Sequence, residues 1–431
     1  MGSKTVLGHF RACFQKSQFK RISGLVVIPA LLTWVYFPGL AGPYSTGKLI
    51  VTAILGMWLA FGVTQTRRTD LLGALYLATL VVSTLVSVDL DLSVFGLQLT
   101  YCVGLLAAFV LVPFWTCSTN QDFRSLQIGL RIAGVGLALV GLAQKFGVEF
   151  VTPFPLPFGE RAYSTMGSPV YAGQIAAMLL PFAVGKIELG LLCAFLWATG
   201  SRGAWLAAAV GFFYLRWPQF SPRVRFYVVS GCLSAFLLAL CLRPPSDLGR
   251  ACLWSAAVEA FAMRPWVGWG TGSFLIVADI WRDSAWVEAF GRSTQDHAHN
   301  AWLEALSSGG IIGFFGLVVL WYATSRTQNR IGRASLIAVA ISSLVNPLPL
   351  PVKALAIMIS AMGQESQPAS KFISGVVKCF SLACLLAVTW LVHLDRMVIG
   401  YTRYAWSISS GQAAFKTNMI RVLRQRREFK F

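Results

Sequence analysis

Two of the four histidines in the chain stand one residue apart, at His297 and His299, just before an apolar run. An imidazole with an ordinary pKa near 6.5 can accept the proton of a hydroxyl group near neutral pH. Glu304 follows His299 a little more than one helical turn later, where its carboxylate could support the base. We therefore expect general-base chemistry at this pair of histidines. The candidate supporting residues are His297, Asn300 and Glu304.

A metal centre formed by Asp296, His297 and His299 is an alternative use of the same stretch. The H-x-H spacing alone is weak for zinc, because no H-E-x-x-H motif and no third histidine stand nearby. A purely structural pair of histidines is a further alternative. Base chemistry is the leading interpretation, and we expect neither a metal ion nor an organic cofactor.

Three arginines stand in short polar stretches between apolar runs, at Arg161, Arg202 and Arg250. A guanidinium group can bind phosphate oxygens through two parallel hydrogen bonds. A helix that begins near Arg202 would add free N–H groups and the positive end of its dipole. The pattern favours a site for an anion, although interfacial arginines in ordinary loops would show the same residues.

The stretch 264–274 is rich in glycine and has the form G-x-G-x-G between positions 268 and 272. It is not a Walker loop, because no G-K-[ST] follows, and it lacks the βαβ context of a dinucleotide site. A tight backbone turn without a ligand is the alternative for these glycines. Since no ATP motif is present, the leaving group of the donor would have to drive a transfer reaction.

The elements that position these residues are apolar. Hydrophobic residues make up 56% of the 431 positions, charged residues only 12%, and the mean hydropathy is +0.65. This composition excludes a soluble enzyme, a disordered chain and a fibrous repeat. We predict an all-α polytopic membrane protein with about 12 transmembrane helices (12–13). The apolar runs are 22–41, 48–64, 71–88, 95–116, 126–146, 170–185, 187–199, 203–216, 224–242, 300–323, 333–346, 352–363 and 372–393.

Loop charges predict the orientation of this bundle. The chain has 36 Lys and Arg against 17 Asp and Glu, a net charge of +19. Basic loops near 65–68, 216–225 and 326–333 agree with a cytoplasmic N-terminus, because cytoplasmic loops are enriched in Lys and Arg. The stretches 147–169 and 243–298 then lie outside. We expect no nucleic-acid partner, since no basic stripe is interleaved with aromatic residues in a soluble segment.

The C-terminal end admits two interpretations. Counting 333–346 and 352–363 separately gives thirteen spans and an outer tail, whereas one helix broken at 346–349 gives twelve spans and an inner tail. The basic residues of the tail favour the inner position. We therefore expect a transmembrane catalytic domain over 1–395 and a basic amphipathic tail over 396–431.

The longest segment between spans, 243–298, is dense in Trp and Phe, so we expect helices in it that lie over the bundle. The nine cysteines form no C-x-x-C pair, which argues against a zinc site and a disulfide framework. We interpret the first apolar run as a retained span rather than a signal peptide, because no small-residue cleavage site follows it.

Four motifs in order resemble the O-antigen ligase / O-antigen polymerase superfamily, and among its members the chain is most similar to an O-antigen ligase. By motif the resemblance covers about 145–365, and the long outer loop before the histidines is also typical of that family. The motifs are S-R-G-A-W-L-A at 201–207, G-R-x-x-x-W at 249–254, R-P-W-V-G-W-G-T-G-S-F at 264–274 and H-A-H-N-A-W-L-E-A-L-S-S-G-G-I-I-G at 297–313.

This resemblance implies a GT-C-like bundle in the bacterial inner membrane, with an active site that faces the periplasm. It implies an inverting, metal-independent glycosyltransferase that moves an O-antigen-like glycan from undecaprenyl pyrophosphate to a hydroxyl of lipid A–core. His299 would then be the base that activates the acceptor. Arg250 would bind the donor pyrophosphate, with Arg202 and Arg161 assisting. The arginines would stabilise the charge that develops on the leaving group.

Several alternatives remain open at this point. The superfamily also contains repeat-unit polymerases and protein O-oligosaccharyltransferases. The stretch S-S-L-V-N-P-L at 342–348 is faintly similar to the H-S-L-x-E-x-P-L element of the oligosaccharyltransferases but lacks its His and Glu. A transporter of a lipid-linked glycan is an alternative from another class, because its broken helices and buried arginines would look similar. The sequence leaves the sugars, the acceptor and the oligomeric state undetermined.

Overall fold

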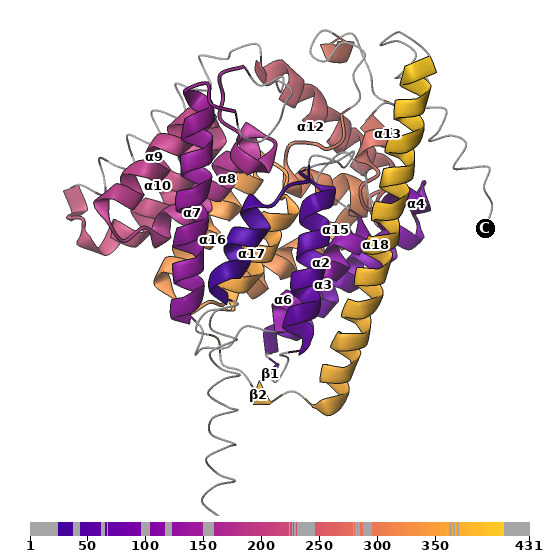
Figure 1. Cartoon of the computed structure of the whole chain (residues 1–431), viewed down its shortest axis with the longest axis horizontal. Coiled ribbons are helices and arrows are strands. Elements are labelled where there is room, and N and C mark those ends of the chain that lie inside the picture. The colour runs from indigo at the N-terminus through magenta and orange to yellow at the C-terminus, as the bar shows by residue number, and fades with distance from the viewer. Residues whose placement is uncertain are drawn as a thin grey trace, which may run out of the picture.

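The computed structural model is a bundle of helices (Figure 1). It describes residues 25–37, 44–61, 65–66, 68–95, 104–116, 123–149, 159–223, 225, 227, 230, 246–278, 280, 285–287, 295–361, 364, 367–368 and 370–408. In that part of the chain the strands are limited to one antiparallel pair of two residues each, β1 (Gln65–Thr66) and β2 (Gln367–Pro368). The predicted all-α class is confirmed there.

The helices follow the apolar runs of the sequence. The predicted run at 224–242 and the tail beyond Ile408 lie mostly or wholly outside the described residues. The helices are Leu25–Trp34, α2 (Thr46–Phe61), α3 (Arg68–Leu85), α4 (Leu90–Phe95), α5 (Leu105–Val110), α6 (Val112–Thr116), α7 (Phe123–Lys145), α8 (Pro169–Leu179), α9 (Lys186–Thr199), α10 (Arg202–Arg216), α12 (Ser246–Met263), α13 (Phe274–Ala278), α15 (Ala301–Ser325), α16 (Arg330–Ser343), α17 (Leu350–Ser360) and α18 (Lys371–Ile408). Short 3₁₀ turns are η2 (Ser164–Met166), η3 (Leu180–Phe182) and η4 (Trp217–Gln219).

Three of the described helices are long and apolar enough to cross a membrane, namely Phe123–Lys145, Ala301–Ser325 and Lys371–His393. Six further apolar helices have 10–17 residues. This pattern supports a membrane protein, while the count of 12–13 spans stays a prediction. The chain leaves helical structure between α16 and α17, where the sequence predicts a break.

Small residues bring α8, α10 and α16 into close contact. A Cβ atom added to Gly211 of α10 would lie 2.9 Å from the carbonyl oxygen of Ala334 in α16. A Cβ atom at Gly173 of α8 would lie 2.8 Å from the Cβ of Ala204 in α10. Close backbone approach at small residues is the usual way in which helices pack in a membrane. These contacts hold α10, which begins at Arg202, against α8 and α16.

Helix α15 is interrupted near its middle. At Gly310 the backbone takes φ 59° and ψ −156°, which is not helical. The N–H of Ile311 donates to the carbonyl oxygen of Pro265 at 2.8 Å, and that of Ile312 donates to Trp266 at 3.2 Å. A broken helix inside a membrane protein is tolerated where other protein groups satisfy the freed backbone. The glycine-rich segment 264–274 does so here.

The same segment contacts α15 with its own backbone. The N–H of Trp269 donates to the carbonyl oxygen of Ser307 at 3.2 Å. The N–H of Gly270 donates to the carbonyl oxygen of Ser308 at 2.8 Å. Gly268 has φ 67°, and a Cβ atom there would lie 2.4 Å from the carbonyl carbon of Ser308. The glycines thus permit a tight turn against a helix break, as the ligand-free alternative expects.

The two termini of helix α10 lie at different ends of the bundle. Arg202 begins the helix and Arg216 ends it, roughly 20 Å away at 1.5 Å per residue. At the Arg216 end, Nη2 of Arg330 donates to the carbonyl oxygen of Leu215 at 2.9 Å. The basic loops 216–225 and 326–333 therefore lie together, and Arg202 lies away from them.

The segment 243–298 forms helices in its described part, as expected. Leu253 and Ala257 of α12 form a small apolar core with Phe274 of α13, Trp286 and Ala298. Helix α12 lies across one end of the bundle, opposite the end at which β1 and β2 pair (Figure 1). In this small core Ala298, which lies between the two histidines, packs with residues of α12.

Candidate active site

Arg161 lies against the end of α9. Its Nε donates to the carbonyl oxygen of Thr199 at 2.8 Å, and its Nη2 donates to that of Gly200 at 3.4 Å. Gly200 ends α9 with φ 59°, and a Cβ atom there would lie 3.2 Å from Nε of Arg161. A cation is favoured at a helix C-terminus, where carbonyl oxygens lack helical partners. The end of α9 therefore fixes the position of this guanidinium group.

Arg202 and Arg250 lie close enough to Arg161 to act on its charge. The pKa of Arg161 is lowered, first by burial and then by the positive charges of Arg202 and Arg250. Arg202 is the first residue of α10, and Arg250 lies in the first turns of α12. Three elements thus bring three guanidinium groups together. Such a concentration of like charge attracts an anion with several negative charges.

His297 is held on both sides of its ring. Its Nδ1 lies 2.5 Å from Oδ1 of Asp296, and its Nε2 lies 3.2 Å from the hydroxyl of Tyr171 in α8. Burial disfavours the charged ring, but the hydrogen bond and charge of Asp296 and the charge of Glu304 outweigh burial and raise the pKa of His297. With both nitrogens occupied, His297 suits a fixed, charge-bearing role better than that of an open base.

His299 has the opposite electrostatic character. Its backbone is left-handed, with φ 50°, which is uncommon for a residue other than glycine. Burial, followed by the positive charge of His297, lowers the pKa of His299 to about 3, and Arg250 adds to this effect while Asp296 opposes it. The ring is therefore neutral near pH 7 and can accept a proton. The contribution of Arg250 also places His299 beside the arginine cluster.

Asn300 and Glu304 hold the backbone of the histidine loop. Oδ1 of Asn300 accepts from the N–H groups of Trp302 at 2.9 Å and Leu303 at 3.1 Å, so Asn300 is the N-cap of α15. Oε2 of Glu304 accepts from the N–H of Ala298, between the two histidines, at 2.7 Å. Both residues support the loop through its backbone rather than by bonds to the His299 ring.

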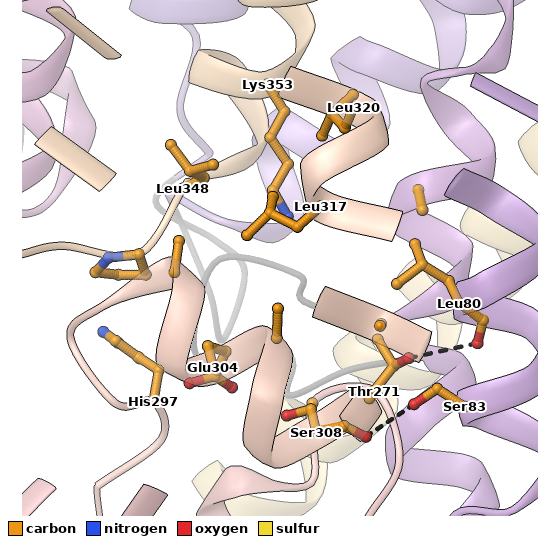
Figure 2. Close-up of a pocket in the computed structure, with 18 of the residues that line it drawn as sticks. Leu80, Ser83, Thr271, His297, Glu304, Ser308, Leu317, Leu320, Leu348 and Lys353 are labelled. Carbon is orange, nitrogen blue, oxygen red and sulfur yellow. Dashed lines mark hydrogen bonds between the residues drawn. The ribbon is translucent and has the colours of Figure 1, made fainter. Parts of the chain in front are cut away.

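A cavity opens beside this loop (Figure 2). His297 and Glu304 line it on one side, and Lys353 of α17 points into it from the other. Much of the remaining lining is apolar, as at Leu317. His299 and the three arginines are outside this lining. The cavity and the arginine–histidine cluster are therefore neighbouring features that meet at the histidine loop.

The structure brings together every site residue that the sequence predicts, and it adds two. Tyr171 bonds to His297, and Lys353 faces the cavity. Lys353 has a signal in the sequence, because a charge within an apolar run is costly in a membrane. Tyr171 has none, since a tyrosine in an apolar helix is ordinary. Among the described residues, no group of three His, Cys, Asp or Glu side chains is arranged to hold a metal ion.

Residues 189–318 match the family model for O-antigen ligase. This segment is therefore similar to O-antigen ligases. The predicted resemblance to the O-antigen ligase superfamily is thereby confirmed. The matched segment contains Arg202, Arg250 and the whole histidine loop, whereas Arg161 precedes it and Lys353 follows it. A search of curated proteins finds no match to the chain.

Proposed function

We propose that this protein transfers an O-antigen-like glycan from undecaprenyl pyrophosphate to a hydroxyl of lipid A–core, with inversion and without a metal ion. The proposal places the protein in the bacterial inner membrane, with the arginine–histidine cluster on the periplasmic side. The match of residues 189–318 to the family model for O-antigen ligase supports glycan transfer of the ligase type. The observation that carries the proposal is the meeting of three arginines with a neutral histidine at one end of the bundle.

In this proposal the arginines bind the leaving group. The pyrophosphate would lie among the guanidinium groups of Arg161, Arg202 and Arg250, which offer several parallel N–H donors. As the bond between C1 of the glycan and the pyrophosphate oxygen breaks, its electron pair leaves with the oxygen. The fixed positive charges stabilise that developing negative charge without reorganisation, which is the largest usual source of catalysis.

His299 would act on the acceptor. Its neutral ring takes the proton of the acceptor hydroxyl while that oxygen forms the new bond to C1, on the face opposite the departing pyrophosphate. Glu304 and Asn300 position the loop that presents the ring. The proton then passes from His299 to the solvent or to the released pyrophosphate, and no oxidant, reductant or nucleotide is consumed.

The low pKa of His299 has a consequence for the order of events. Without substrate, positive neighbours that include Arg250 help to lower its pKa to about 3, which makes the ring a weak base. A bound pyrophosphate would offset the charge of Arg250 and so raise the proton affinity of His299. His299 is then the strongest base when the donor is bound. Before the donor binds, its low pKa keeps the ring unprotonated and ready to accept a proton.

A reconstituted transfer reaction tests the proposal. The full chain is mixed with a lipid-pyrophosphate glycan and lipid A–core, without ATP and with or without EDTA. Glycan on the core that is insensitive to EDTA, with inverted configuration at C1, is the expected result. Elongation of the donor without transfer to the core would instead indicate a polymerase, and modified protein would indicate an oligosaccharyltransferase. No new glycosidic bond with any acceptor would overturn glycan transfer.

A further inference from the structure

A second basic pocket lies on α7, away from the arginine–histidine cluster. It is formed by α7, by the connection from η3 to α9 and by the start of α16. Three polar side chains of its lining come from one face of α7, because positions i, i+3 and i+7 of a helix lie together. They are Arg124, Gln127 and Arg131.

This pocket lies near the other end of the bundle. The C-terminal residue of α7, Lys145, pairs with Glu160 at 3.2 Å, beside Arg161. Arg124 is near the N-terminus of the same helix, about 30 Å away at 1.5 Å per residue. Ile331, in the first turn of α16, also lines the pocket and joins it to the basic loop 326–333.

The charge balance of the pocket favours one negative charge. Nε and Nη2 of Arg131 donate to the two carboxylate oxygens of Glu188, at 3.1 and 2.5 Å, so these two charges offset one another. Within the described part of the chain, Arg124 has no hydrogen-bond or ion-pair partner. One uncompensated guanidinium group beside the amide of Gln127 matches a singly charged phosphodiester.

Apolar side chains extend from this polar group over the outside of the bundle. Ile128 of α7 is 40% exposed, Val184 in the connection from η3 to α9 is 76% exposed, and Ile187 at the start of α9 is 80% exposed. In a membrane protein, exposed apolar side chains of this kind contact lipid chains. A free phosphate ion would use the arginine only, whereas a phospholipid would use both parts of the surface.

We propose that this pocket, lined by Arg124 and Gln127 and flanked by Ile128, Val184 and Ile187, binds an anionic phospholipid in the leaflet opposite the arginine–histidine cluster. The phosphodiester bonds to Arg124 and Gln127, and the acyl chains lie over the three apolar side chains. Basic pockets between transmembrane helices bind anionic headgroups in this way. The site is independent of the proposed glycan transfer, which occurs at the other end of α7.

Native mass spectrometry of the delipidated full chain in detergent tests this site. The probes are phosphatidylglycerol, phosphatidylcholine with the same acyl chains and inorganic phosphate. We expect one phosphatidylglycerol to be retained in preference to both other probes. Arg124→Gln should weaken its binding about fivefold, whereas Arg124→Lys, which keeps the charge, should weaken it less. Arg131 is left unchanged, because its removal would leave Glu188 without its ion-pair partner.

Arg223→Gln is the matched control, since Arg223 is an exposed arginine that does not line the pocket. It should leave phosphatidylglycerol binding unchanged. Equal retention of phosphatidylcholine, or equal weakening by Arg223→Gln, would overturn the proposal in favour of general lipid or charge attraction. Binding of inorganic phosphate that competes fully with phosphatidylglycerol would assign the pocket to a free anion instead.

Discussion

His299 combines a left-handed backbone at φ 50° with a pKa that burial and positive neighbours lower to about 3. Strained backbone of this kind persists only where the surroundings hold it, and it is concentrated at functional sites. The N-cap at Asn300 and the bond from Ala298 to Glu304 provide that support on the C-terminal and N-terminal sides of His299. The residue is therefore held in a conformation and a protonation state that suit a proton acceptor.

The lowered pKa of His299 predicts a dependence of stability on pH. The unfolded chain binds a proton at this residue below about pH 6.5, whereas the folded chain does so only near pH 3. The contribution of His299 is thus present above pH 6.5 and is lost as the pH falls toward 3. The raised pKa of His297 changes stability with pH in the opposite direction. The contribution of His299 is therefore isolated by comparing a His299 variant with the parent protein. His299→Gln should weaken the loss of thermal stability between pH 6.5 and 4.

The matched control for that measurement is His393→Gln, because His393 is an exposed histidine on α18. Unfolding temperatures in detergent are compared at each pH for the parent and both variants. A pH profile of His299→Gln that is parallel to the profile of the parent would contradict the assignment of a buried, neutral ring.

Glu304 is expected to position the histidine loop. Glu304→Gln keeps an oxygen that can accept from Ala298, so transfer should fall less than about tenfold, the equivalent of one ordinary hydrogen bond. Glu304→Ala removes the acceptor and should reduce transfer further, mainly through kcat. Equal activity of the alanine and glutamine variants would show that this bond does not position the loop.

Arg250 is expected to bind the donor. Arg250→Gln should weaken donor affinity about 10- to 100-fold, the range for losing hydrogen bonds to a charged group. Arg264→Gln is the control, because Arg264 lies over the ring of Trp269, 4.3 Å from its centroid, and outside the cluster. Donor binding is measured by fluorescence with a lipid-pyrophosphate glycan. Equal losses in both variants would contradict a specific role for Arg250.

At the scale of elements, the break in α15 decides where the site lies. Gly310 leaves the helix, and the glycine-rich segment 264–274 satisfies the freed N–H groups of Ile311 and Ile312. The half of α15 before the break contains Glu304 and follows the N-cap residue Asn300. The break and the glycine-rich segment therefore form one hydrogen-bonded unit next to the histidine loop.

This unit predicts a strong effect of Gly310→Ala. Its φ of 59° and ψ of −156° lie in a region that is open essentially to glycine alone and would cost an alanine roughly 1–3 kcal/mol, and a Cβ atom 2.5 Å from the carbonyl carbon of Trp266 would add strain. Gly190→Ala is the control, because Gly190 lies within α9 with open space around its Cβ position. The control should be neutral or about 0.5–1 kcal/mol more stable. Chemical unfolding in detergent measures both, and equal effects would contradict the role of the break.

The sequence predicts the elements well because apolar runs, glycines and loop charges are local signals. The runs that contain α7, α15 and the first part of α18 coincide with the three helices long enough to cross a membrane. The interruption at Gly310 is not predicted, because its cause is a backbone contact with a segment about 45 residues earlier. Long-range contacts of this kind leave no periodic trace in a sequence.

The same limit applies to the site. His299 and the three arginines are predictable, because charged groups stand out in an apolar chain. The resemblance implies that they share one site, whereas the way in which they approach one another depends on how α9, α10 and α12 meet. The opposed characters of His297 and His299 come from Asp296, Tyr171 and burial. Sequence spacing alone gives both histidines equal standing.

At the scale of the whole molecule, basic residues of the described part of the chain gather at two ends of the bundle. One end gathers Arg161, Arg202 and Arg250 around a histidine, and the other gathers the basic loops 216–225 and 326–333. Excess positive charge in loops marks the cytoplasmic side. The arginine–histidine end should then face the periplasm, where a lipid-linked glycan and lipid A–core could meet.

Labelling of single cysteines tests this orientation. In a cysteine-free background, Glu160→Cys should react with a membrane-impermeant maleimide in spheroplasts, because the Glu160 side chain is 92% exposed beside Arg161. Arg223→Cys, in the loop 216–225, should react only after the membrane is opened. The reverse pattern would place the cluster in the cytoplasm and contradict the proposed function.

The most direct test of the central claim separates donor binding from transfer in His299→Ala. Donor affinity is measured by equilibrium binding, and transfer to lipid A–core is measured in a single turnover with saturating donor. We predict donor affinity within about threefold of the parent and a transfer rate at least 100-fold lower, as expected for the loss of a general base. Transfer at the parental rate in His299→Ala would contradict the assignment of His299 as the base and, with it, the account of this site.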